Sequence, residues 1–427
     1  MFNMLKNEEK NLVLDISADE IFAHIENMCA HGPRYVGSEA DSKAIEYFKK
    51  KLNEYGAEVI EEEFEAPAFE ERKSLLKITS PIEMEIPCKA VFFTTPTPSE
   101  GVSGELIFVG SGSKEEFEKT NVEGKIVVVE NSPESPKGAL GLEISLAASK
   151  GAEAYVLAHF ASPPYVLMTE TGFFDRSKRF VEMEPKEIPA VIIGSLHWKK
   201  LYSLMEKDTV KGTLLVDAIR EKRKTKNVRG IILGKKHPEK RILLVAHRDT
   251  VSCPGASDNT SGNAIILELA RIFSKYRPDT TIEIVSFGAG EVLGCVGSWT
   301  YMEKHKDELK NVIGAINLDA VGFGGHLRIV TEGSWIDAGP IKTDTKINRL
   351  LEEAAKDLNY VVKHTVCMLG LSDATPFLVN DVPAAWLWKY DDPYWHTDLD
   401  IPENIDPNSL KITAEIVGLA AKRLSEK

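Results

Sequence analysis

The chain has 427 residues, of which 43% are apolar and 27% charged, and it carries a formal net charge of -13 at pH 7. This is the composition of an ordinary folded protein, and the length predicts two domains, or one domain with a large insertion. The acidic balance argues against nucleic acid or an anionic membrane as a partner, since both attract a basic surface.

The N-terminal and cysteine patterns predict a cytoplasmic location. No apolar run reaches the ~20 residues that span a bilayer, and Met1–Leu14 lacks the apolar stretch of a secretory signal. The five cysteines form no Cys-x-x-Cys pair, which favours buried thiols over disulfides or a thiolate zinc site: Cys29, Cys88, Cys253, Cys295 and Cys367. An exported protein whose signal lies outside this sequence stays open.

Two helices and a strand are predicted near the N-terminus. Apolar residues recur at helical spacing in Asp19–Ala30 and Ser38–Tyr55, and Ala57–Phe64 then alternates as a strand does. The two short basic runs lie within an acidic chain. We interpret Lys49–Lys51 as a solvated helix face and Arg220–Lys226 as a connector.

Residues 75–220 differ from the rest of the chain in their sequence pattern. Short β runs alternate there with glycine, proline and serine, and one helical stretch is predicted at Leu142–Lys150. The block contains no cluster of His, Asp and Glu residues, so we interpret it as an inserted, non-catalytic β-rich domain. Residues 1–74 and 221–427 would form the other domain. The β runs of the insert are Glu105–Val109, Lys125–Val129, Ala154–Ala158 and Ala190–Ile193.

Residues 241–427 alternate between strands and helices. This alternation predicts an α/β domain with a mixed, largely parallel sheet and helices on both faces. The expected strands are Arg241–Ala246, Thr281–Phe287, Val312–Leu318 and Ala384–Trp388. The expected helices are Asn263–Tyr276, Ile347–Leu358 and Leu410–Leu424.

Metal-ligating side chains follow the ends of three predicted strands. These are His247, Glu291 and Asp319, while Asp258 and His396 lie on loops that can reach the same sheet edge. Ligands bind at this edge of open α/β sheets. Catalytic zinc takes imidazole and carboxylate ligands, and paired ions about 3.5–4 Å apart can share a carboxylate. The five residues therefore predict a zinc centre with two ions per chain.

Asp249 stands two residues after His247. At that spacing its carboxylate can hydrogen-bond the imidazole and fix its tautomer. We therefore count Asp249 as a catalytic residue that positions the imidazole.

Ordered motifs surround these positions: Arg34-Tyr35-Val36-Gly37-Ser38, His247-Arg248-Asp249, Gly255 to Gly262, Asn317-Leu318-Asp319, Ser372-Asp373, and His396-Thr397 with Asp400. They resemble the motifs of the co-catalytic zinc aminopeptidases, a family related to glutamate carboxypeptidase II and the glutaminyl cyclases. Residues 75–220 resemble the protease-associated domain often inserted in this family, notably at Gly124–Val129 and Ala148–Ala152. The resemblance covers nearly the whole chain.

The resemblance implies a role for each ligand. Asp258 would bridge two zinc ions, His247 and Asp319 would complete one site, and His396 with a glutamate would complete the other. It also implies a cis peptide bond between Asp258 and Asn259.

The chain departs from the family at the third strand end. The family has two adjacent glutamates there, a general base and then a metal ligand, whereas this chain has only Glu291. Counting forward from Phe287, Gly290 replaces the base and Glu291 is the ligand. Counting back from Ser298, Glu291 is the base and Val292 replaces the ligand. Strand register is rigid and the following turn can absorb an extra residue, which favours the first count. Both counts stay open.

These features predict a zinc metallo-aminopeptidase that removes N-terminal residues from peptides through a metal-activated water. A carboxypeptidase or amide cyclase on the same scaffold is the alternative enzyme, with Lys389 as the nearest cation for a terminal carboxylate. The lone Glu291 also leaves open a non-catalytic peptide-binding protein. The expected partner is a peptide, and homo-oligomerisation stays open.

Two further features lie close to the predicted centre. The resemblance places Asp373 near the substrate amine. Five aromatic residues precede His396. We favour a role in core and loop packing, and the alternative is a pocket for an apolar substrate side chain. They are Trp386, Trp388, Tyr390, Tyr394 and Trp395.

Overall fold

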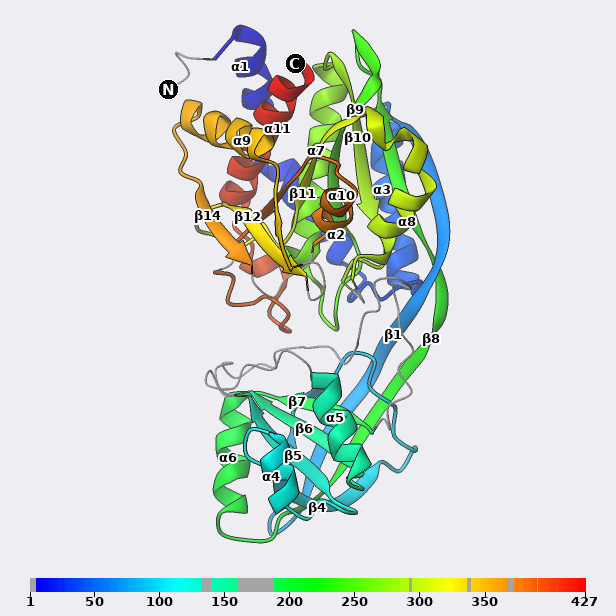
Figure 1. Ribbon diagram of the computed structural model, residues 1–427, viewed down its shortest axis with the longest axis vertical. Coiled ribbons are helices and arrows are strands. Elements are labelled where there is room, and N and C mark those ends of the chain that lie inside the picture. Colours follow the sequence, from blue (N-terminus) through cyan, green and yellow to red (C-terminus); the bar gives the residue numbers. More distant parts are fainter. Residues whose placement is uncertain are drawn as a thin grey trace. The chain divides into compact units, whose positions relative to one another are not determined.

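The computed structural model describes residues 5–131, 140–159, 188–291, 294–335, 339–367, 372–389 and 391–427. The chain divides into two compact units (Figure 1). The first unit comprises Met1–Ala66, Arg223–Trp395 and Asp400–Lys427, and the second comprises Pro67–Lys222 and His396–Leu399. The sequence places the corresponding boundaries after residues 74 and 220.

A mixed sheet forms the centre of the first unit. Its strands, in spatial order, are β13 (Gly339–Lys342), β12 (Arg328–Trp335), β15 (Ala384–Trp388), β11 (Val312–Leu318), β9 (His237–His247), β10 (Thr280–Phe287) and β8 (Lys211–Ile232). The pairs β15–β11, β11–β9 and β9–β10 are parallel, and β14 (Lys363–Cys367) pairs in parallel with β12. The outer pairs β10–β8, β12–β15 and β12–β13 are antiparallel. The predicted largely parallel sheet is confirmed.

Helices cover both faces of this sheet, as predicted. Because alternate side chains of a strand point to opposite faces, Leu244 of β9 packs in one buried cluster and its neighbours Leu243 and Val245 in another. The helices that contribute to the first cluster are α1 (Asn7–Leu14), α2 (Ala18–Cys29), α3 (Glu39–Glu54), α7 (Gly262–Lys275), α9 (Thr345–Asp357) and α11 (Pro407–Ser425). Those that contribute to the second are α8 (Val296–Lys304) and α10 (Ala374–Val379).

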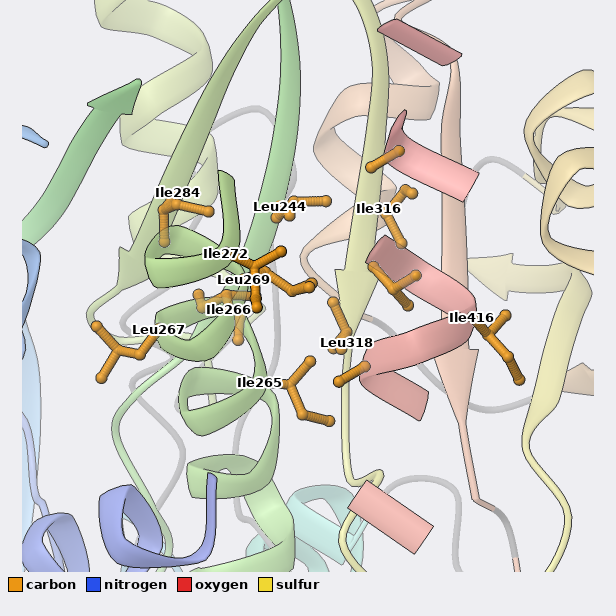
Figure 2. Close-up of a cluster of buried hydrophobic side chains, with 14 of the residues drawn as sticks. Leu244, Ile265, Ile266, Leu267, Leu269, Ile272, Ile284, Ile316, Leu318 and Ile416 are labelled. Carbon is orange, nitrogen blue, oxygen red and sulfur yellow. The ribbon is translucent and has the colours of Figure 1, made fainter. Parts of the chain in front are cut away.

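The helix α7 lies at the centre of the first cluster. Figure 2 shows its residues Ile265, Leu269 and Ile272 beside strand residues that include Leu244 and Ile316. Burial of each such side chain contributes about 1.5–3 kcal/mol to stability, so α7 is held firmly against the strands on which it packs. Among the described residues, no helix combines the length and apolar character that crossing a membrane requires.

The basic run Arg220–Lys226 lies within β8 and, as expected of a connector, spans the boundary between the two units after Lys222. The Nζ of Lys224 is 2.8 Å from Glu63 Oε1, and the Nζ of Lys226 is 2.5 Å from Glu61 Oε2. Both acids belong to β1 (Glu58–Ser80), which pairs with β8. Alternating lysines therefore face alternating acids across two strands, and a charge run alone could not reveal this partner.

The second unit contains a smaller sheet with strands in the order β4 (Val102–Phe108), β5 (Ile126–Asn131), β6 (Ala154–His159), β7 (Ala190–Ile193) and β3 (Cys88–Ala90). Its first three strand pairs are parallel and β7–β3 is antiparallel. The other elements are β2 (Met84–Ile86), α4 (Lys114–Lys119), α5 (Leu140–Ser149) and α6 (Ser195–Met205). The helix expected at Leu142–Lys150 corresponds to α5.

His24 of α2 predicts a loss of stability in acid. The ring is 1% exposed and lies between two phenols, with Nδ1 2.7 Å from Tyr47 Oη and Nε2 3.2 Å from Tyr55 Oη. Burial, helped by Lys51 and Arg271, lowers the pKa of His24 to about 4. The folded state thus favours the neutral ring, so its stability is complete above pH 6.5 and falls as the pH drops from 6.5 towards 4.

We expect His24 to account for roughly 2–3 kcal/mol of the stability lost between pH 7 and pH 4.5. Urea unfolding of the wild type and of His24→Gln at the two pH values measures this difference. The variant should be less stable at pH 7 and lose less on acidification. An equal loss in both proteins would contradict the assignment.

Candidate metal centre

His247, the last residue of β9, lies between two carboxylates. Its Nε2 is 3.3 Å from Asp258 Oδ1 and 3.4 Å from Asp319 Oδ1. Ligand atoms about 2.0–2.1 Å from a tetrahedral zinc ion lie about 3.3 Å from one another. The imidazole and both carboxylates therefore have the donor chemistry and the spacing that zinc requires. His247 and Asp258 are buried, and the side chain of Asp319 is 13% exposed.

The carboxylates also control the protonation of His247. Burial alone would lower the pKa of the imidazole, but hydrogen bonds to Asp258 and Asp319, together with their charges, raise it well above its usual range. A cation in this position is therefore strongly favoured. A divalent metal and the imidazolium proton compete for the same nitrogen, because zinc binds neutral imidazole.

Glu291 belongs to the same cluster. One ligand atom each from His247, Asp258 and Glu291 lie within 4.8 Å of one another. Glu291 follows β10, which pairs in parallel with β9 so that Phe287 lies opposite His247. Adjacent parallel strands thus deliver both side chains to one edge, as predicted.

The carboxylate of Asp249 holds the backbone of Glu291. It accepts the amide N–H of Gly290 at 2.7 Å and that of Glu291 at 3.1 Å. The expected bond from the imidazole is not its main contact, since the nearest carboxylate oxygen is 3.9 Å from His247 Nδ1. The carbonyl oxygen of Asp249 takes that place at 3.2 Å. Asp249 therefore links the His247 loop to the Glu291 loop.

Gly290 has no room for a side chain. A Cβ on this residue would lie 2.2 Å from His247 Cβ and 2.7 Å from its Cγ. The preceding Ala289 has a left-handed φ of 54°, which turns the chain directly after β10. The backbone at residue 290 thus passes so close to His247 that no side chain fits, and Glu291 is the next residue along the chain.

The loop around Asp258 is fixed through its backbone. The Asp258–Asn259 peptide bond is cis, as the resemblance implies. The carboxylate of Asp400 accepts the amides of Ser257 at 2.6 Å and Asp258 at 3.0 Å. Asn263 donates to the carbonyl oxygens of His247 and Asn259 at 2.5 and 2.8 Å. The sequence alone assigned no role to Asp400 and none to Asn263. The positioning role of Asn263 is recognisable only from the two carbonyl groups to which it donates.

Arg34 also fixes these two loops. Its buried guanidinium donates to the carbonyl oxygens of Arg248 at 2.7 Å, Pro254 at 2.8 Å and Gly255 at 3.2 Å. These acceptors flank His247 and precede Asp258. The N-terminal motif that begins at Arg34 is therefore structural.

Of three other predicted residues, Asp373 lies beside Gly290, since a Cβ on Gly290 would be 3.4 Å from Asp373 Oδ2. Asp373 is fully buried and accepts the hydroxyl of Ser298 at 2.6 Å, and burial raises its pKa to about 7. Lys389 is 3% exposed and donates to the carbonyl oxygen of Phe323 at 2.9 Å. His396 has a left-handed φ of 56° and groups with the second unit, so its role as a ligand stays a prediction. Tyr390 lies outside the described residues.

Comparisons with known proteins find similar peptidases. Residues 227–421 match the model of peptidase family M28. The chain is 25% identical to Aminopeptidase YwaD of Bacillus subtilis (strain 168) in an alignment 449 positions long, which covers 99% of this chain and 88% of YwaD.

Two solved structures are similar to nearly the whole chain. An aminopeptidase from Aneurinibacillus sp. strain AM-1 is 25% identical with a TM-score of 0.71, and the match covers 98% of this chain and 96% of that one. A peptidase M28 precursor from Shewanella amazonensis SB2B is 21% identical, with the same coverage and a TM-score of 0.81, and thus shares the fold.

Proposed function

We propose that the chain is a metal-dependent aminopeptidase of peptidase family M28, whose model matches residues 227–421, and that it hydrolyses the first peptide bond of its substrates. The observation that carries this proposal is the convergence of His247, Asp258, Asp319 and Glu291 at one sheet edge. The names of the aminopeptidases matched over nearly the whole chain support the same reaction class.

The proposed ligands are His247, Asp258 and Asp319 for one zinc ion, with His396 as a further ligand if a second ion binds. When bound, zinc lowers the pKa of water and polarises the substrate carbonyl. Of the protein groups, Asp249, Asp400 and Arg34 hold the ligand loops by hydrogen bonds to their backbones. Little reorganisation is then needed when the ligands bind the ion.

We assign the general base to Glu291. Its carboxylate lies within 4.8 Å of ligand atoms of His247 and Asp258, and Gly290 cannot be replaced by the missing glutamate without a clash with His247. Glu291 would take a proton from the attacking water and deliver it to the leaving amine. This is the second of the two counts allowed by the sequence.

A carboxypeptidase is less well supported. The cation proposed for a terminal carboxylate, Lys389, is buried and donates to Phe323 and Ser409. It thus has little capacity to bind a substrate. Carboxylates at the centre suit a free α-amine better, because opposite charges attract.

The proposal also covers the role of the second unit and the location of the protein in the cell. The second unit would be a protease-associated-like insert without a catalytic role, since the described residues offer one candidate metal group and it lies in the first unit. The buried thiols of Cys29, Cys88, Cys253 and Cys295 support a cytoplasmic location.

The test compares two chromogenic substrates, leucine p-nitroanilide and its N-acetylated form. The purified chain should hydrolyse only the free amine, and metal chelation should lower the rate by at least about 100-fold, since metal activation contributes several kcal/mol. Added Zn²⁺ should restore it. Hydrolysis of both substrates alike, or none by a zinc-loaded chain on a panel of aminoacyl substrates, would overturn the proposal.

A further inference from the structure

The two oxygens of Asp258 face different partners. Oδ1 is 3.3 Å from His247 Nε2, whereas Oδ2 accepts the indole N–H of Trp395 at 2.5 Å. A carboxylate that bridges two metal ions gives one oxygen to each. The oxygen on the His247 side is therefore placed for a first ion, and the oxygen required by a second ion is bound to Trp395.

We propose that Trp395 is a gate on the second metal position: its indole holds Asp258 in a form that binds one ion tightly and must swing away before a second ion binds. This inference rests on the proposed metal centre. An N–H group and a cation are both attracted to the same carboxylate oxygen. A hydrogen bond to a charged group is strong enough to lower the competing affinity by about 10–100-fold.

Neighbouring aromatic rings hold Trp395 in place, and its exposure to solvent allows the side chain to rotate. Its ring lies 6.3 Å from that of Trp388 at an interplanar angle of 66°, and Trp388 stacks on Trp386 at 5.7 Å and 18°. Aromatic contacts of this geometry are attractive and hold the ring over Asp258. The residue is nevertheless 37% exposed, so rotation away from Asp258 does not require the core to open.

The gate predicts two unequal binding steps. The first ion would use His247, Asp319 and Oδ1 of Asp258 without disturbing the indole. The second would break the Trp395–Asp258 bond. Since indole emission depends on the polarity and hydrogen bonding around the ring, fluorescence should change in the second step and stay nearly constant in the first.

The experiment titrates Zn²⁺ into the full chain after metal removal, with bound zinc measured by equilibrium dialysis and tryptophan emission recorded in parallel. Trp395→Phe keeps an aromatic ring but removes the N–H group. It should tighten the second step about 10–100-fold and leave the first unchanged. The matched control Trp198→Phe removes an indole that donates to Glu130 of the second unit and should keep both the weak second step and its fluorescence change.

Each outcome decides the proposal. If Trp395→Phe binds the second ion no more tightly than the wild type, or if wild-type emission follows the first ion, the gate is wrong. The emission measurement needs no variant and remains decisive if Trp395→Phe fails to fold. A wild-type chain that binds no zinc at all would instead refute the metal centre itself, and the gate with it.

Discussion

Glu291→Gln is expected to lower kcat by about 10²–10⁴-fold while the zinc content stays at the wild-type value. Glutamine has nearly the same shape and can accept hydrogen bonds, but its amide does not take up a proton at neutral pH. The backbone bonds from Gly290 and Glu291 to Asp249 do not involve the changed side chain, so the loop should keep its conformation. Zinc analysis and kcat measured on the same preparation test the expectation.

The matched control for this variant is Asp319→Asn. Asp319 faces the imidazole directly, with Oδ1 3.4 Å from His247 Nε2, so its change should lower the affinity for zinc together with the rate. If Glu291→Gln also loses zinc, Glu291 is a ligand and the count forward from Phe287 is correct. Unchanged activity in Glu291→Gln would exclude both roles.

The sheet and its ligand edge could be predicted because both depend on local patterns. Apolar runs of strand length give β9, β10, β11 and β15 within a few residues of their observed bounds. His247 is the last residue of β9 and Asp319 directly follows β11, so parallel pairing of the two strands brings them together. The loop that carries Asp258 could be assigned to the same centre from the order of the motifs along the chain.

Contacts between distant residues could not be predicted in this way. The bond from Trp395 to Asp258 joins positions 137 residues apart, and an aromatic residue beside a histidine gives no sign of it. The charge pairs of β8 depend on the register of β1. Asp249 was expected to bond the imidazole because it stands two residues away, but the carbonyl group of the same residue is closer to Nδ1. Backbone geometry decided between these groups.

Gly290→Glu would restore the paired glutamates of the family, and we expect it to lose zinc and gain no activity. Its Cβ would lie 2.2 Å from His247 Cβ, so either the imidazole or the loop must move. Overpacking of this kind costs about 1–3 kcal/mol of stability. The same displacement would take His247 Nε2 away from Asp258 and Asp319, which should weaken zinc binding.

Gly290→Ala separates the steric effect from the added charge, because it introduces the same Cβ without a carboxylate. Both variants should release zinc more readily than the wild type, as measured by competition with a chelator, and both should melt at lower temperature. Gly290→Glu should suffer more, since Asp373 Oδ2 would lie 3.4 Å from the new Cβ and two carboxyl groups would meet in a buried site. A Gly290→Glu chain with full zinc content and a higher kcat would show that the loop adapts, and Glu291 would then be the ligand.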